Sequence, residues 1–194
     1  MSNHYKPRRV TDESAPMRTV LFRSRNKDNK SVPGFTERYK RFLTRKTPEE
    51  LHGAFEDFVE KGLSGETSRF YMSVNERDNA ATRKALLHML IDSEDVDMAT
   101  LGQMATSVAS KRENAATKHW MFDVDSNDPN TLRGLLAHVE DQVARSGIPN
   151  EMEVKKTPNG WHVITEHGFD TRGLDMTDIG LDKDGLTFVE WKTK

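Results

Sequence analysis

The chain has 194 residues, of which 31% are charged and 35% hydrophobic, and a formal net charge of −2. This length allows one domain or two fused modules, with a lean core under a polar surface. The absence of cysteine excludes disulfides and thiolate metal sites and favours a cytoplasmic protein. The longest apolar run, residues 85–91, is too short to span a membrane, and the first residues lack a secretory apolar segment, so we expect no membrane partner.

Positive charge is concentrated in the first part of the chain. Residues 1–50 contain 13 Lys+Arg against 6 Asp+Glu, which leaves 16 against 25 for the remainder. Such a basic segment suits contacts with nucleic-acid phosphates. A flexible basic tail over residues 1–17 is an equally good explanation for the first of these charges. We predict phosphate contacts for the cations that follow the strand-like residues 19–22: Arg23, Arg25, Lys27 and Lys30.

Local signals predict a first αβ module over residues 18–112. Thr47, Pro48 and Glu50 form a capping-box sequence, so a helix begins there and ends near Lys61. Apolar periodicity predicts the other elements of this module: strands at 19–22 and 69–74, and helices at 79–91 and 97–112.

A second module follows over residues 113–194. A strand at residues 120–125 leads into a helix with Asp128 as N-cap, Pro129 in its first turn and Gly147 at its end. The apolar stripe of this helix is regular, so its buried face is well defined.

A hairpin and a final strand complete the second module. Residues 151–155 and 161–165 predict two strands joined by the tight turn at 157–160. Loop-like sequence at 168–185 precedes a last strand at 186–191. Before this last strand, the second module therefore has the order β-α-β-β.

We expect an α/β (α+β) architecture for the whole chain. The strands that contain Phe122, Val163 and Val189 have matching apolar alternation. We therefore predict that these three strands share one sheet, backed by the helix at 132–143.

The strand at 120–125 brings two carboxylates to one face. Because strand side chains alternate, Asp123 and Asp125 point to the same side, and Trp120, Phe122 and Val124 form the buried side. Paired carboxylate oxygens suit Mg²⁺ or Mn²⁺. The sequence thus predicts a divalent-metal site, although Asp-x-Asp is also common at solvated strand edges.

The same alternation applies to the second strand of the hairpin. Trp161 and Val163 belong to the apolar side, which sends His162 to the face of the carboxylates. With Lys155 and Lys156 nearby, such a group can hold a divalent ion and contact triphosphate oxygens. A surface histidine beside a turn and a solvated lysine pair are the alternative.

Two motifs resemble those of the archaeo-eukaryotic primase superfamily, which includes primase-polymerases and the polymerase domain of bacterial end-joining ligases. They are Phe122-Asp123-Val124-Asp125 and Lys155-Lys156-Thr157-Pro158-Asn159-Gly160-Trp161-His162-Val163, with an amphipathic helix between them. The resemblance implies an N-terminal αβ half packed on an RRM-like module with a mixed or antiparallel sheet. It also implies that Asp123 and Asp125 bind divalent metal and that His162 contacts the incoming nucleotide.

In that family a later apolar strand supplies a third acidic residue. By the alternation of the last strand, Glu190 lies on the required face, so we predict that it is catalytic. Asp178 and Asp182 are the alternatives, but both lie in loop-like sequence. A missing third carboxylate would leave a protein that binds nucleotide or nucleic acid without efficient transfer.

Three function classes follow. The first is a metal-dependent nucleotidyltransferase resembling a DNA primase or primase-polymerase, which uses nucleoside triphosphates, nucleic acid and Mg²⁺ or Mn²⁺. The second is a non-catalytic module that holds single-stranded nucleic acid through the basic segment and through Tyr5, Phe35 and Tyr39. The third is a metal-dependent nuclease that uses the same carboxylates.

Overall fold

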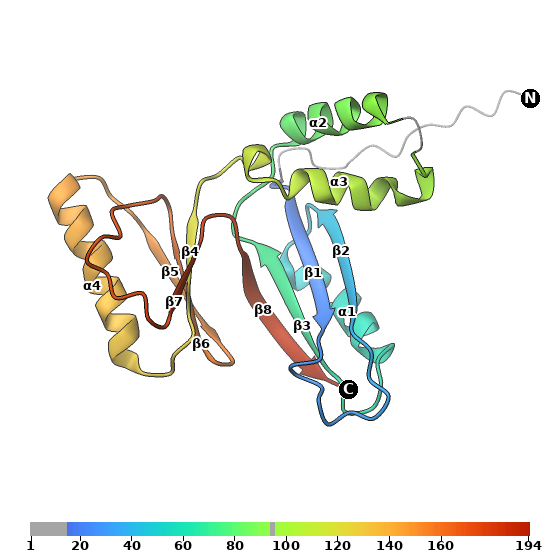
Figure 1. Ribbon diagram of the computed structural model, residues 1–194, viewed down its shortest axis with the longest axis horizontal. Helices are drawn as coiled ribbons and strands as arrows, with labels where there is room; N and C mark the ends of the chain where they lie inside the picture. Colours follow the sequence, from blue (N-terminus) through green and yellow to red (C-terminus); the bar gives the residue numbers. More distant parts are fainter. Residues whose placement is uncertain (1–14, 94–95) are drawn as a thin grey trace, which may run out of the picture.

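Two four-stranded antiparallel sheets form the framework of this α+β protein. The computed structural model describes residues 15–93 and 96–194, so nearly all of the tail predicted at residues 1–17 lies outside the described residues. The first sheet has the strand order β2-β1-β3-β8 and the second the order β5-β6-β4-β7. Figure 1 shows the sheets side by side, with α4 on the outer side of the second sheet and α2 and α3 across one end of the first.

The described elements include the strands and helices that the sequence predicts, together with β2 and β7, which it does not. In chain order they are β1 (Arg18–Ser24), β2 (Arg38–Thr44), α1 (Pro48–Glu60), β3 (Thr67–Ser73), α2 (Asn79–Asp92), η1 (Met98–Thr100), α3 (Leu101–Ala109), η2 (Arg112–Asn114), β4 (Trp120–Val124), α4 (Pro129–Ser146), β5 (Met152–Thr157), β6 (Gly160–Thr165), β7 (Ile179–Asp182) and β8 (Leu186–Thr193).

One face of the first sheet packs against α1. Phe22 of β1 is fully buried, and its ring centroid lies 5.0 Å from that of Phe70 in β3 and 5.2 Å from that of Phe55 in α1. At the start of α1, the Thr47 side chain accepts from the Glu50 N–H while the Glu50 carboxylate accepts from the Thr47 N–H, which confirms the predicted capping box. The opposite face of this sheet is open toward the second sheet.

Helices α2 and α3 lie against each other at one end of the first sheet. The predicted helix at residues 79–91 is present as α2. The helix predicted at residues 97–112 is instead divided into the 3-10 turn η1 and the shorter α3. Leu87 and Ile91 of α2 are 53% and 79% exposed, so much of its apolar surface stays in solvent. Among the helices of the described segments, none has the length and apolar character needed to cross a membrane.

The second module is an antiparallel sheet with α4 on one face. Helix α4 ends at Gly147, whose φ of 68° lies in the left-handed region that favours glycine. Leu135 and Val139 of α4 are fully buried and pack in one cluster with Phe122 of β4. The sequence missed β7, which pairs with β4 as the fourth strand. The sheet β5-β6-β4-β7 is antiparallel, which is one of the two sheet types expected for the second module, but its fourth strand is β7.

The β5–β6 hairpin closes tightly over the end of β4. Thr157 pairs with Gly160, so Pro158 and Asn159 alone form the turn. A Cβ atom on Gly160 would lie 1.8 Å from the backbone oxygen of Val124. Only glycine therefore allows the hairpin to approach the strand that ends next to Asp125.

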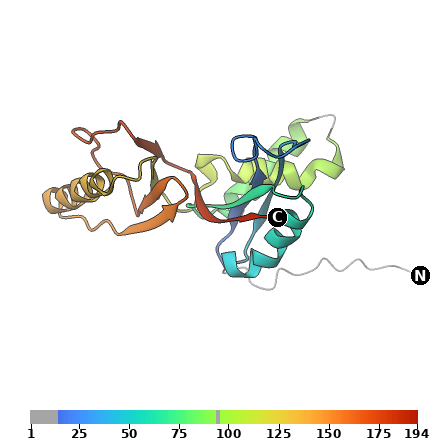
Figure 2. The ribbon, with the colours of Figure 1, turned by 90° about the horizontal axis from the view of Figure 1, so that it is seen from below.

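The final strand does not join the second sheet, so this prediction is wrong. Strand β8, which contains Val189, pairs antiparallel with β3 at the edge of the first sheet. The strands that contain Phe122 and Val163 do pair with each other, as expected. Figure 2 shows β8 crossing between the two modules. The second sheet therefore ends with β7, and the last residues of the chain complete the first module.

A buried polar network holds the junction between the modules. The Arg77 side chain is 2% exposed, and its Nη1 donates to Asp184 Oδ2 at 2.8 Å. The Asn75 Nδ2 donates to Asp184 Oδ1 and to the backbone oxygen of His119, both at 3.1 Å. Both connections, the one that enters β4 and the one that leaves β7, are thus bound to the segment that follows β3.

Candidate active site in the cleft between the two sheets

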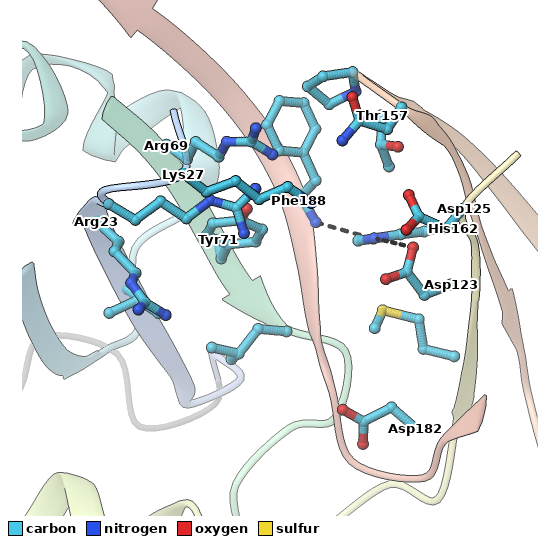
Figure 3. Close-up of a pocket in the computed structure, with 16 residues that line it drawn as sticks. Arg23, Lys27, Arg69, Tyr71, Asp123, Asp125, Thr157, His162, Asp182 and Phe188 are labelled. Carbon is cyan, nitrogen blue, oxygen red and sulfur yellow. Dashed lines mark hydrogen bonds and ion pairs between the residues drawn. The ribbon is translucent and has the colours of Figure 1, made fainter. Parts of the chain in front are cut away.

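The open faces of the two sheets form the walls of a cleft of about 410 Å³ (Figure 3). The wall from the first sheet, here called the cationic wall, is mainly basic and aromatic: Leu21, Arg23, Arg25, Lys27, Arg69, Tyr71, Leu186 and Phe188. The wall from the second sheet, here called the acidic wall, carries the carboxylates and the hairpin turn: Met121, Asp123, Asp125, Thr157, Pro158, Asn159, His162 and Asp182.

The two predicted carboxylates lie together on the acidic wall. Phe122 and Val124 are fully buried toward α4, so the alternate residues Asp123 and Asp125 face the cleft. The Asp125 N–H donates to the backbone oxygen of Asp178 at 2.9 Å, which fixes the chain just beyond β4. The strand alternation read from the sequence is therefore confirmed for this strand.

His162 joins the carboxylates, as predicted, and also connects the two sheets. It is 6% exposed and pairs directly opposite Asp123 in the antiparallel register of β4 and β6. Its Nδ1 accepts from the backbone N–H of Phe188 at 3.2 Å and lies 3.2 Å from Thr187 Oγ1. Because Nδ1 is an acceptor, Nε2 carries the proton and points at Asp123 Oδ1, 3.4 Å away. The dashed lines in Figure 3 follow this chain from Phe188 to Asp123.

Groups on both walls of the cleft affect the pKa of the Asp123 carboxyl group. The hydrogen bond from His162 is the largest cause that holds the pKa of Asp123 below its usual value, and burial acts in the opposite direction. The positive charges of Arg25 and Lys27 on the facing wall add to the lowering. Asp123 is therefore ionised at neutral pH and 55% exposed to the cleft.

On the cationic wall, Asp28 holds two guanidinium groups. Arg25 Nε donates to Asp28 Oδ2 at 2.8 Å, and Arg69 Nη2 donates to Asp28 Oδ1 at 2.6 Å. Arg23 Nη2 lies 3.4 Å from Glu37 Oε2. Lys27 forms no ion pair with any residue in the described part of the chain. Three of the four side chains predicted to contact phosphates, Arg23, Arg25 and Lys27, thus line the cleft, as Figure 3 shows for Arg23 and Lys27.

The fourth predicted cation and both predicted lysines lie outside the cleft. Lys30 is exposed on the β1–β2 connection. Lys155 is on the same face as His162, but it forms an ion pair with Glu153 at 3.2 Å. Lys156 is on the other face, where its Nζ lies 3.9 Å from the centroid of the Trp161 ring. Lys155 and Lys156 therefore do not join His162 in the cleft as predicted, whereas the phosphate contact of Lys30 stays a prediction.

Glu190 is also absent from the cleft, so its predicted position on the face of the carboxylates is wrong. Its Oε1 lies 3.0 Å from His52 Nδ1 of α1, on the face of the first sheet away from the acidic wall. The reason is a β-bulge: Phe70 pairs with Glu190 and Tyr71 with Phe188, so Val189 is an extra residue in β8. An extra residue breaks the period-two alternation on which the prediction depended.

The structure adds Arg69 and Tyr71, which the sequence reading missed, and Asp182, which it gave only as an alternative to Glu190. Asp182 lines the cleft because β7 places it opposite Met121 of β4, on the face of Asp123. Arg69 and Tyr71 line the cationic wall. The predicted strand at 69–74 contained the signal for the last two, because they alternate with buried residues.

The acidic wall suits a metal ion only together with further ligands. Among residues 15–93 and 96–194, no three His, Asp or Glu side chains are grouped closely enough to hold a metal ion on their own. Mg²⁺ is commonly held by one or two carboxylates, with waters and substrate phosphates as its other ligands. Asp123 and Asp125 have the donor atoms for a site of this type, which waters and substrate phosphates complete.

Comparisons of the chain with protein-family models, with curated proteins and with solved structures give no match. The function is therefore inferred from the cleft and from the residues that line it.

Proposed function

We propose that the protein is a metal-dependent nucleotidyltransferase that acts on nucleic acid with nucleoside triphosphates, similar to a primase or primase-polymerase. One observation carries the proposal: a single cleft has the paired carboxylates Asp123 and Asp125 on one wall and Arg25, Lys27 and Arg69 on the other. A triphosphate suits the cationic wall, and the divalent ion that accompanies it suits the carboxylates. Neither wall alone offers both kinds of contact.

Asp123 and Asp125 are the residues that would hold Mg²⁺ or Mn²⁺. When bound, such an ion neutralises phosphate charge and helps a hydroxyl to attack the α-phosphorus. His162 donates to Asp123 Oδ1, which orients the carboxylate, while Oδ2 has no partner among the residues that the structure describes. The lowered pKa of Asp123 keeps this ligand ionised at neutral pH.

The cationic wall would bind the triphosphate. Asp28 holds Arg25 and Arg69 in place before any ligand arrives, which reduces the ordering cost of binding. Beside these cations, the rings of Tyr71 and Phe188 lie 5.9 Å apart and offer apolar surface to a base or sugar.

The resemblance to the archaeo-eukaryotic primase superfamily supports the proposal separately. The two motifs that carry it lie on the neighbouring strands β4 and β6, and their key residues, Asp123 and His162, are direct cross-strand partners. By that resemblance, His162 contacts the incoming nucleotide. A cytoplasmic location, which the lack of cysteine favours, belongs to the same proposal.

A binding module without catalysis is the second candidate. It is favoured by the lack, in the described ranges, of a group of three possible metal ligands. In this case the carboxylates of the acidic wall are spectators, and the cationic wall holds nucleotide or nucleic acid by charge.

Nucleotide incorporation by the parent protein decides between these functions. The assay uses primed and unprimed single-stranded templates, all ribo- and deoxyribonucleoside triphosphates, and Mg²⁺ or Mn²⁺, with a nucleic-acid binding titration in parallel. Nucleotidyl transfer predicts extended products with at least one metal. Intact binding without incorporation under every condition would reject it and leave the binding module.

A further inference from the structure

The open face of the first sheet continues beyond the cleft to the outer edge strand β2. Arg23 pairs in register with Tyr39 of β2 on one side and with Arg69 of β3 on the other, and Arg69 pairs with Trp191 of β8. Cross-strand partners lie on the same face, and Arg23 and Arg69 line the cleft. One row across all four strands therefore reads Tyr39, Arg23, Arg69, Trp191.

The neighbouring row on this face has a similar composition. Leu21 pairs with Arg41 of β2 and with Tyr71 of β3, and Tyr71 pairs with Phe188 of β8. Aromatic rings and guanidinium groups are thus interleaved in these two rows. We call the two rows together the aromatic-basic face.

The outer rings of this face are presented to solvent and do not serve the core. Tyr39 is 73% exposed and Trp191 57% exposed. The two rings lie at opposite ends of the same row, and each is next to an arginine. An exposed ring offers its face for stacking, and an unpaired base is a partner of matching shape.

The charge of the face is positive after its internal pairs are counted. Arg23 faces Glu37, and Arg69 shares Asp28 with Arg25. Arg41 is exposed and forms no ion pair within the described residues. A polyanion is therefore the complementary partner in charge.

We infer that the aromatic-basic face binds single-stranded nucleic acid, with bases stacked on Tyr39 and Trp191 and phosphates held by Arg23 and Arg41. The two rings are separated by three strand spacings, about 14 Å, so they stack on different bases. A duplex suits the face less well, because its bases are already stacked on one another. The inference rests on the proposed function in one respect: the bound strand is the template for the cleft.

The test is a binding titration with a fluorescent oligothymidylate of about 20 nucleotides and its uridylate counterpart. Tyr39→Ala and Trp191→Ala should each weaken binding about tenfold, because each removes one stacking contact. Tyr39→Phe and Trp191→Phe keep a ring and should bind nearly as the parent does. Both side chains are exposed, so the alanine variants should keep the thermal stability of the parent, which the same samples verify.

A matched pair on β2 tests the charge contribution. Arg41 lies on the aromatic-basic face, and the adjacent Lys40 pairs with the buried Phe22 and thus lies on the α1 face. Arg41→Ala should lower the log-log salt slope of binding by about 0.7, whereas Lys40→Ala removes the same charge and should leave the slope unchanged.

The inference is overturned if the parent does not bind the oligonucleotides, if both ring removals bind as tightly as the parent, or if Lys40→Ala reduces the slope as much as Arg41→Ala. Equal affinity for a duplex, with no effect of Tyr39 or Trp191, would also overturn it. Failure of the proposed function looks different, because nucleotide incorporation is then absent while ring-dependent binding persists.

Discussion

The Nδ1 atom of His162, in the second sheet, accepts a 3.2 Å hydrogen bond from the backbone N–H of Phe188, in the first sheet. That bond leaves Nε2 as the donor to Asp123. The same ring therefore joins β8 to the acidic wall and orients a carboxylate in the cleft. We therefore expect both stability and the proposed nucleotide binding to depend on this ring, and suitable substitutions separate the two.

His162→Ala should lower the free energy of unfolding by about 1–3 kcal/mol, because Phe188 and Thr187 lose a hydrogen-bond partner. His162→Asn should retain much of that stability, since its side-chain oxygen reaches the position of Nδ1. Both variants lose the contact with Asp123, so both should bind nucleoside triphosphate more weakly. Urea denaturation and nucleotide titration measure the two effects, and an alanine variant as stable as the parent would contradict the bridging role.

Asp28 should make the stability of the cationic wall depend on pH. Its side chain is 11% exposed, and although burial raises the pKa of Asp28, hydrogen bonds from Arg25 and Arg69 outweigh burial and lower it. A folded pKa below the unfolded value of 3.8 means that the carboxylate stabilises the fold above that pH and loses its effect as the pH falls through the folded pKa.

Asp28→Asn should therefore cost about 3 kcal/mol of unfolding free energy at pH 7 and progressively less below about pH 4. The control is Asp170→Asn. Arg172 lowers the pKa of Asp170 to about 2, but this pair is exposed, so the substitution should have little effect on stability at pH 7. A parent-to-variant difference for Asp28→Asn that is as large at pH 3 as at pH 7 would rule out this linkage.

The elements predicted best are those whose signals are local. The capping box at Thr47 and the helix from Asp128 to Gly147 are encoded within a few residues, and the structure contains both. Strand alternation also placed Asp123 and His162 on one face, because β4 and β6 have no bulge in their pairing.

The features that the sequence did not predict depend on pairing between strands that are far apart in the chain. Strand alternation says which side chains share a face but not which sheet a strand joins, so β8 was assigned to the wrong sheet, and the bulge at Val189 moved Glu190 away from the cleft. Strand β7 has only four residues, and β2 is an edge strand with charged residues on both faces. Neither has the apolar alternation that predicts a strand.

Gly160 should be irreplaceable for packing reasons. The Cβ of Gly160→Ala would lie 1.8 Å from Val124 O and 3.0 Å from Ser126 O, so the hairpin or the end of β4 must shift. We expect a loss of about 3 kcal/mol of unfolding free energy. Gly134→Ala on the exposed side of α4 meets nothing within 4 Å and should stabilise the protein by about 0.5–1 kcal/mol. Thermal unfolding of both variants checks the contrast, which equal effects would contradict.

Asp182 should matter for nucleotidyl transfer, and Glu190 should not. Asp182 lies on the acidic wall, whereas Glu190 faces His52 of α1. Asp182→Asn should reduce metal-dependent incorporation about 10- to 100-fold, as is typical for groups that support metal ligands. Glu190→Gln should retain the parent rate. The reverse result in a primer-extension assay would return Glu190 to the site.

The most direct test of the cleft is Mn²⁺ binding, followed by the loss of the free-ion electron paramagnetic resonance signal with and without nucleoside triphosphate. If the two walls bind the ion and the triphosphate together, as we propose, the triphosphate should strengthen Mn²⁺ binding by the parent. Asp123→Asn and Asp125→Asn should each weaken the binding of Mn²⁺ with triphosphate about tenfold or more, while the affinity for single-stranded nucleic acid stays unchanged. Equal Mn²⁺ binding by the parent and both Asn variants in the presence of triphosphate would contradict the account.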